Sequence, residues 1–405
     1  MVKKHLLILG GGALNYKSVQ EAKDNGFITY VADQNPNAPC FNIADVAIVA
    51  DISLGADVFA KIKSYKIDGV VSMAEAGVVA AAHLTEKLKT GGISIATANN
   101  CTSKAAMRNA WKDTPYSVAF KIITTYNEAV IAAAELSNYP LIMKPDKTFG
   151  GSRGVSKINS KEELKAAFDY ASSSGLNEFV ILEECAEGDE FSCEVVVTKG
   201  KAHLLCIGEK VKSPAPFRVD CSVQYPARLS HMQETEIEKM CQTATTKIGI
   251  ENGVAHVEFA YTNNGPKLFE LGARCGGGHT PMIAKYVSGV NEFIAYCSIA
   301  CGLNPKISPY KIKKGAEYRF VIFEPGTVQE VVIPPSFIDD ERVFDLVVTI
   351  KSGDKIMPLI NTSARAGALV VFEETLQKAI ELSDTICKQL KVHYVNGEEK
   401  SAILF

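Results

Sequence analysis

The sequence lacks several features that would place it in other classes of protein. It has no run of about 18 or more apolar residues, so no transmembrane helix is expected. Its 11 cysteines include no CxxC pair, which argues against a zinc site. Its formal net charge is only −3, so no overall positive field attracts nucleic acid or a membrane surface. We therefore expect no nucleic-acid partner and no membrane partner.

The start of the chain shows no sign of a signal peptide. MVKKHLLILGGG contains too short an apolar run and is typical of a first β-strand. The cysteines are then expected to be reduced core residues of a cytoplasmic protein. Apolar residues make up 47% and charged residues 22% of the 405 residues, which is typical of globular proteins. This length allows two or three domains with full cores.

Residues 1–97 alternate apolar strands with helical stretches. The expected strands are 5–9, 27–32, 46–50, 68–72 and 93–96, and the expected helices are 16–25, 56–65 and 75–90. Alternation of strand and helix with short turns is typical of a doubly wound parallel sheet. The fold class is therefore α/β at the N-terminus, and α+β for the whole chain.

The rest of the chain mixes strands and helices without internal repeats. The expected helices are 99–113, 127–137, 160–174, 231–248, 279–302 and 373–391. The expected strands are 118–122, 141–144, 179–184, 191–197 and 201–207, and 315–350 is rich in β-forming residues. A hairpin is expected around Lys199-Gly200.

The segment 254–278 carries two carboxylates in apolar strands. Glu258 and Glu270 flank the turn Asn263-Asn264-Gly265. A three-residue loop with Gly265 left-handed and bulged would bring the two carboxylates directly opposite each other, where they repel. A hard cation such as Mg²⁺ would reverse that repulsion. A two-residue turn would instead pair Glu258 with Phe269 and put the carboxylates on opposite faces.

Two glycine-rich loops are candidates for phosphate binding. Residues 142–155, IMKPDKTFGGSRGV, place Lys144 at a strand end before an amide-rich turn, which favours a phosphate-covering flap over a plain hairpin. No GK[ST] follows, so this is not a Walker A loop. The first loop, Gly10-Gly11-Gly12, precedes a helix, and Asp33 ends the next strand. It is a partial dinucleotide motif, a small-ligand site or a plain tight turn.

Two further segments carry charged residues at strand ends. In Glu183–Glu190 the backbone is able to face a purine edge and Glu190 to hold ribose hydroxyls, although an exposed acidic turn explains this segment alone. In the second segment, Arg274 follows Glu270 and precedes a glycine run that enters a helix. A guanidinium beside free amides is suited to an anionic substrate. The residues expected to contact substrate are Gly276, Gly277, Gly278, His279 and Arg218.

In this order the motifs resemble the ATP-grasp superfamily of carboxylate–amine and carboxylate–thiol ligases. The resemblance covers most of residues 1–305. It implies a pre-ATP-grasp domain over 1–97 and an ATP-grasp domain over 98–305. A mobile ATP-covering subdomain is implied at about 117–190, and residues 306–405 would complete the substrate side. The Glu-Leu-Gly-Ala-Arg motif at 270–274 is similar to that of the subgroup holding L-amino-acid ligases, and phosphoribosylglycinamide synthetase and carbamoyl-phosphate synthase share the frame.

The resemblance implies a role for each matched residue. Lys104 and Lys144 match the lysines that contact ATP phosphates, and Lys144 and Arg274 would be catalytic. Glu258 and Glu270 match the carboxylates that bind Mg²⁺ or Mn²⁺. Many members have Asn two residues after the second glutamate, where this chain has Gly272. The remaining ATP-contacting residues implied by the match are Phe149, Gly150, Gly151, Ser152, Glu183, Glu184, Cys185, Ala186 and Glu190.

The implied function is an ATP- and Mg²⁺-dependent ligase that couples a carboxylate to an amine through an acylphosphate. Its partners would be small-molecule substrates and a second copy of the chain in a homodimer. One alternative is a catalytically altered ATP-binding regulatory protein, which Gly272 supports. Others are a carboxylase or carbamoyl-phosphate-type enzyme of the same superfamily, and an NAD-dependent enzyme built on the first glycine loop.

Overall fold

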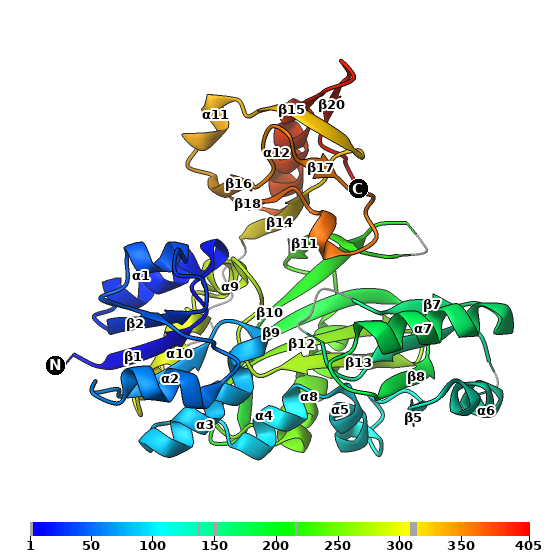
Figure 1. Ribbon diagram of the computed structural model, residues 1–405, viewed down its shortest axis with the longest axis horizontal. Helices are drawn as coiled ribbons and strands as arrows, with labels where there is room; N and C mark the ends of the chain where they lie inside the picture. The colour runs from blue at the N-terminus through cyan, green and yellow to red at the C-terminus, as the bar shows by residue number, and fades with distance from the viewer. Residues whose placement is uncertain (1–2, 137, 149–152, 215–216, 308–313) are drawn as a thin grey trace.

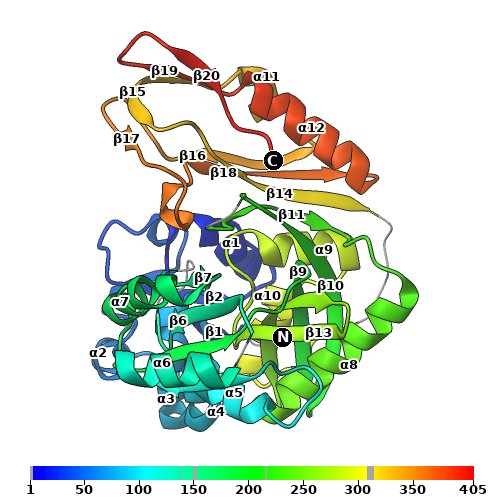
Figure 2. The ribbon, with the colours of Figure 1, turned by 90° about the vertical axis from the view of Figure 1, so that its right-hand side faces the viewer.

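A computed structural model describes residues 3–136, 138–148, 153–214, 217–307 and 314–405, and Figures 1 and 2 show it from two sides. No helix among these residues is long and apolar enough to cross a membrane. All 11 cysteines are unpaired, and only Cys185 is not buried, as expected for reduced core residues.

The N-terminal part is a parallel sheet of four strands in the order β3-β2-β1-β4. One face packs on α1 and α10, and the other packs on α2 and α3, so the expected doubly wound arrangement is confirmed. The elements are β1 (His5–Leu9), η1 (Ala13–Asn15), α1 (Tyr16–Asp24), β2 (Ile28–Asp33), η2 (Pro39–Asn42), β3 (Val46–Val49), α2 (Gly55–Ile62), β4 (Gly69–Ser72), η3 (Glu75–Gly77) and α3 (Val78–Leu88).

The segment after α3 differs from the sequence expectation. No strand forms at 93–96, because Ser94 caps a helix there by accepting a hydrogen bond from the Thr97 amide. The expected helix 99–113 is divided into α4 (Ile95–Cys101) and α5 (Lys104–Trp111). Ser103 caps α5 through the Ala106 amide. The break places Lys104 in the first turn of α5.

A second, antiparallel sheet has the order β5-β8-β6-β7 and is covered by α6 and α7 (Figure 1). Its apolar side chains form a separate core, which includes Leu141, Met143 and Leu182. The elements are β5 (Phe120–Ile123), α6 (Tyr126–Leu136), β6 (Leu141–Pro145), β7 (Ser156–Ile158), η4 (Lys161–Glu163), α7 (Leu164–Ser174) and β8 (Val180–Glu184).

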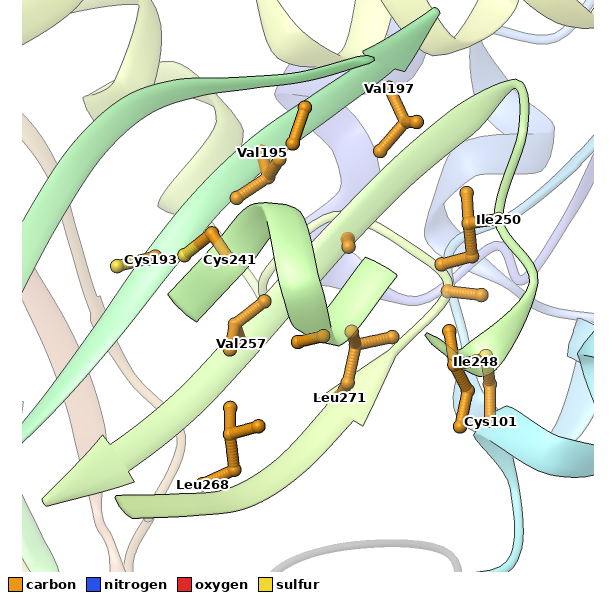
Figure 3. Close-up of a cluster of buried hydrophobic side chains, with 14 of the residues drawn as sticks. Cys101, Cys193, Val195, Val197, Cys241, Ile248, Ile250, Val257, Leu268 and Leu271 are labelled. Atoms are coloured by element: carbon orange, nitrogen blue, oxygen red, sulfur yellow. The ribbon is translucent and has the colours of Figure 1, made fainter. Parts of the chain in front are cut away.

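The central sheet is antiparallel, with eight strands in the order β13-β12-β9-β10-β11-β14-β18-β16. Helix α8 packs on one face, where Cys241 and Ile248 meet Cys193, Val257 and Leu271 (Figure 3). The expected helix 279–302 is interrupted by left-handed Gly289. The elements are β9 (Asp189–Thr198), β10 (Lys201–Lys212), β11 (Asp220–Tyr225), α8 (His231–Ile248), β12 (Gly253–Thr262), β13 (Gly265–Gly272), α9 (Thr280–Ser288) and α10 (Glu292–Ala300).

The C-terminal part adds three strands to the central sheet and builds a small sheet of its own, β17-β15-β19-β20. Figure 2 shows the C-terminal part at the top of the view, above β11 and α9. The elements are β14 (Gly315–Val321), β15 (Gly326–Val332), α11 (Pro335–Ile338), β16 (Val343–Val348), β17 (Lys355–Ile356), η5 (Thr362–Ala364), β18 (Gly367–Glu373), α12 (Leu376–Gln389), β19 (Lys391–Tyr394) and β20 (Glu399–Ser401).

Candidate active site

A cavity of about 810 Å³ lies where the central sheet meets the β5–β8 sheet and the C-terminal part. Most residues that the sequence singled out line it. They are Lys104, Lys144, Glu183, Glu184, Cys185, Ala186, Glu190, Arg218, Glu258, Glu270, Arg274, Gly277 and Gly278. Gly276 and His279 are not among its lining residues. Phe149, Gly150, Gly151 and Ser152 lie outside the described residues.

The β12–β13 hairpin places Glu258 directly opposite Glu270, so the register expected from the sequence is confirmed. The three-residue loop with a bulged Gly265, from which the sequence analysis derived this register, was wrong. Thr262 pairs with Gly265 across a two-residue turn, and the shift comes from a bulge at Phe269. A bulge sets two residues of one strand against one of the other. Phe269 and Glu270 therefore both line the cavity.

Each of the two opposed carboxylates has a lysine beside it. Lys104 Nζ lies 3.3 Å from Glu270 Oε1, and Lys210 Nζ lies 3.0 Å from Glu258 Oε2. The side chains of Glu258 and Glu270 keep 32% and 36% of their surface exposed. Burial alone would raise the pKa of Glu258, but Lys210 and His256 lower it well below its usual range. Glu258 is thus an anion that faces the cavity.

Beside this pair lies a partly buried acid–histidine chain, of which His256 also lines the cavity. His256 Nε2 is 3.1 Å from Glu258 Oε1, and its Nδ1 is 2.6 Å from Glu194 Oε1. Burial would lower the pKa of His256, but Glu194 and Glu258 raise it to about 9. Glu194 also accepts a hydrogen bond from the Gly276 amide at 2.9 Å. Next to it, burial and Glu194 raise the pKa of Glu292 well above its usual range.

Lys144, Glu183 and Arg108 form a buried triad, and the sequence analysis did not identify Arg108 as part of it. Glu183 Oε1 lies 2.6 Å from Lys144 Nζ, while Arg108 Nε and Nη2 donate to Glu183 at 2.6 and 3.0 Å. Burial, followed by the charge of Arg108, lowers the pKa of Lys144 to about 8. Burial would raise the pKa of Glu183, but Arg108 and Lys144 lower it to about 2. Arg108 lies four residues after Lys104, on the same helix face, and that spacing was the available clue.

This triad corrects the role expected for Glu183. Its carboxylate points to Lys144 and Arg108, so it is not available to a ligand. The amides of Glu184 and Cys185 donate to the carbonyls of Ala119 and Pro140. Glu183 therefore positions Lys144, and Cys185 and Ala186 contribute to the cavity wall at the end of β8.

At the mouth of the cavity Glu190 is held by two cations. Its carboxylate oxygens lie 2.5 Å from Lys212 Nζ and 3.3 Å from Arg218 Nη2. Lys212 also lies 2.7 Å from Asp220. Arg218, expected at the substrate, is thus placed on the side of Glu190.

The segment after Glu270 is divided between the cavity and the core. Arg274 Nε donates to Glu75 Oε2 at 2.9 Å, and its Nη1 donates to the carbonyl of Cys275 at 2.8 Å. The Gly276 amide is used by Glu194 and so is not free, contrary to expectation. His279 is only 2% exposed, and its Nε2 lies 2.9 Å from Asp345 Oδ2. The ring of His279 packs against Tyr318 and Phe344 of the C-terminal part, and His279 is not among the lining residues of the cavity.

Gly272 leaves room for a Cβ atom. A Cβ placed there would lie 3.5 Å from Glu75 and 3.6 Å from Arg274, an ordinary contact distance. The first glycine loop offers no free acid for a dinucleotide ribose, because Asp33 accepts a hydrogen bond from the Gly11 amide at 2.7 Å. This pairing counts against the NAD interpretation.

The residues fit a magnesium ion shared with phosphates. Among the described residues no three His, Cys, Asp or Glu side chains converge into a complete metal shell. Mg²⁺ does not require one, since it commonly uses one or two carboxylates together with waters and substrate phosphates. Two opposed, partly exposed carboxylates with lysines nearby are a suitable donor set for such an ion.

Comparison with known families agrees with this geometry. Residues 137–282 match the family model described as ATP-grasp domain. Residues 319–395 match the model described as L-amino acid ligase C-terminal domain 2. The two matches cover separate parts of the chain. The second accounts for a region in which the sequence alone showed no readable motif.

Curated relatives and solved structures share the architecture. A formate-dependent phosphoribosylglycinamide formyltransferase of Prochlorococcus marinus is 27% identical over 411 residues, 96% of this chain and 98% of the relative. The protein y4rH of Sinorhizobium fredii is 23% identical, and the match spans 66% of this chain but only 56% of that relative. The structure of an L-amino acid ligase from Bacillus licheniformis aligns with a TM-score of 0.82 at 21% identity, over 97% of this chain and 99% of the other.

Proposed function

We propose that this chain, a member of the ATP-grasp superfamily, is an ATP-dependent carboxylate–amine ligase that releases ADP and phosphate. The observation that carries the proposal is the directly opposed pair Glu258 and Glu270, set among lysines in one cavity. A carboxylate of the substrate would be phosphorylated to an acylphosphate, an amine would attack it, and phosphate would leave. The relatives named as phosphoribosylglycinamide formyltransferase and L-amino acid ligase support this class of reaction.

Catalysis in this proposal is positioning and charge neutralisation. Lys104 and Lys144 would bind phosphate oxygens, with Lys144 aimed by Glu183 and Arg108. Arg274, fixed by Glu75, would stabilise the charge that develops on the transferred group. Such donors are most effective in a cavity that excludes water.

A divalent cation, Mg²⁺ or Mn²⁺, would be held by Glu258 and Glu270. When bound, it would neutralise charge on phosphate oxygens. His256, hydrogen-bonded to Glu194, orients Glu258 from behind, as outer partners of metal ligands do.

The test is Mg²⁺-dependent ADP release when a carboxylic acid and an amine are supplied together. Glu270→Gln removes one of the opposed anions and should abolish release, whereas Glu238→Gln, an exposed change on α8, should leave it unaltered. Full turnover by Glu270→Gln would refute the assignment of this hairpin. ATP binding without ADP release across broad panels of acids and amines would favour the regulatory alternative.

We also propose a cytoplasmic homodimer, as expected from the sequence. Light scattering during size-exclusion chromatography tests the dimer, and a monomer at micromolar concentration would refute it.

A further inference from the structure

A fully buried carboxyl group lies next to the acid–histidine chain and takes no part in the proposed reaction. Glu292 is the first residue of α10, it is 0% exposed, and it is not among the lining residues of the cavity. Helix α10 packs there on β9 and β12, where Val196 and Val254 belong to the same apolar core as Phe293. An unpaired charge in such a layer is strongly disfavoured, so the protonation state of Glu292 needs an explanation.

Hydrogen bonding separates Glu292 from its neighbour Glu194. In the described part of the chain, neither carboxyl oxygen of Glu292 accepts a hydrogen bond. Glu194, in contrast, is bonded to His256 Nδ1 at 2.6 Å and to the Gly276 amide at 2.9 Å. An ionised carboxylate needs donors, whereas a protonated carboxyl group is itself a donor. The negative charge of the pair therefore belongs on Glu194, and the proton on Glu292.

The charges around Glu292 agree with this assignment. Burial, followed by the charge of Glu194, raises the pKa of Glu292 well above its usual range. The Cys275 thiol and the charge of Arg274 act in the opposite direction, but they do not reverse the shift. Two adjacent buried carboxyl groups cannot both ionise without a large cost, so one of them keeps its proton.

Glu194 joins the metal side of the cavity to the glycine run. Through one oxygen it holds His256, whose Nε2 lies 3.1 Å from Glu258, and through the other it holds the Gly276 amide. A Cβ on residue 276 would lie 2.7 Å from Glu194 Oε1, so glycine is what lets the carboxylate approach the backbone here. A rotation of the Glu194 carboxylate would therefore disturb both sides at once.

We propose that Glu292 carries a proton at neutral pH and donates it in a hydrogen bond to Glu194, which fixes Glu194 between His256 and the Gly276 amide. Glu292 is thus a positioning residue, because it acts through Glu194 and lines no part of the cavity. Its effect on the metal rests on the proposed function, whereas its proton does not.

The test uses the full-length protein and three variants. Glu292→Gln keeps a neutral donor, and Glu292→Met keeps the chain length without a polar atom. Glu238→Gln, which removes an exposed carboxylate on α8, is the control. Infrared difference spectra between wild type and each variant measure the carbonyl stretch that only a protonated carboxyl group gives. The electron paramagnetic resonance of free Mn²⁺, with a non-hydrolysable ATP analogue, measures metal affinity, and urea denaturation measures the free energy of unfolding.

We expect wild type at pH 7 to show a protonated-carboxyl band that both Glu292 variants lack and Glu238→Gln keeps. Glu292→Met should weaken Mn²⁺ binding about 3- to 10-fold, less than the roughly 10- to 100-fold typical for direct partners of metal ligands, and Glu292→Gln should restore most of the affinity. Above its ordinary pKa of 4.5, Glu292 has to take up a proton on folding, so Glu292→Met should be at least as stable as wild type at pH 7.

The absence of that band from wild type would overturn the inference, as would unchanged Mn²⁺ affinity in Glu292→Met. A loss of stability in Glu292→Met without rescue of Mn²⁺ binding by Glu292→Gln would also overturn it, since that is the result of a purely structural role. Failure of the proposed function has a different signature. Wild type and Glu258→Gln would then bind Mn²⁺ equally, while the band of Glu292 would still confirm its proton.

Discussion

The two ends of the cavity handle charge in opposite ways. At the end beside β6 and β8, Lys144 and Arg108 share the buried carboxylate of Glu183. At the end built by the C-terminal part, Arg365 lies on the Phe320 ring and donates to the main-chain carbonyl of Asp220. Two cations therefore share one anion at the first end, and the cation at the second end forms no ion pair among the described residues.

The shared carboxylate suits what the first end would receive. A highly charged polyphosphate needs cations whose positions hold whether or not it is bound, and a shared buried carboxylate provides that.

The largest effect should come from breaking the triad of Lys144, Glu183 and Arg108. Glu183→Gln leaves Lys144 and Arg108 buried without their anion, which should cost about 3 to 5 kcal/mol of folding free energy. Because the pKa of Glu183 is lowered from 4.5 to about 2, its contribution is present above pH 4.5 and is lost as the pH falls towards 2. Urea denaturation at several pH values measures the loss of folding free energy and its dependence on pH. Glu184→Gln, exposed on the same strand, is the control, and equal stability of the two variants at pH 7 would contradict the triad.

The next effect tests the same end through catalysis. Lys144→Met leaves Glu183 paired with Arg108, so the fold should persist while kcat/KM falls about 100- to 1,000-fold. Steady-state ADP release is the measurement. Lys121→Met, at a half-exposed lysine that pairs with Glu135 and does not line the cavity, controls for loss of a lysine. A decrease in kcat/KM of less than tenfold would show that Lys144 does not act on the reacting group.

A pH profile sharpens the comparison further. The pKa of Lys144 is lowered to about 8, so the lysine loses its proton, and kcat/KM should decline, as the pH rises through about 8. Lys144→Arg stays protonated over this range, so its decline should be absent. An unchanged decline in Lys144→Arg would assign it to another group, such as the substrate amine.

The smallest effect concerns Gly272 in the middle of the cavity. A side chain fits there at contact distance, so Gly272→Asn should add an amide oxygen and tighten the apparent Mg²⁺ affinity a few-fold. The Mg²⁺ dependence of ADP release measures it, and Gly272→Ala controls for added volume. A weaker affinity in Gly272→Asn than in Gly272→Ala would show that Arg274 and Glu75 need that space.

Local patterns carried most of what the sequence could predict. Alternation of strands and helices was enough for the doubly wound N-terminal sheet, and the order of charged motifs was enough to gather most of the cavity. The pairing of Glu258 with Glu270 was predicted correctly, but from a three-residue loop that does not form. The bulge at Phe269 forms deep in the strand, where Leu268 enters the core, and no turn residue marks it.

The residues that were missed depend on contacts distant in sequence. Arg108 meets Glu183 across 75 positions, and Arg365 meets Asp220 across 145. His279 looked like a substrate residue because it follows the glycine run, yet Asp345 and two aromatic rings hold it in the core. Such partners are brought together by the folded sheet and leave no short motif.

The most direct test of the account is nucleotide-dependent Mn²⁺ binding, measured by the electron paramagnetic resonance of free Mn²⁺. With a non-hydrolysable ATP analogue, wild type should bind Mn²⁺ at least tenfold more tightly than Glu258→Gln or Glu270→Gln, while Glu238→Gln matches wild type. The same Mn²⁺ affinity in all four proteins would contradict the claim that the opposed glutamates hold the metal.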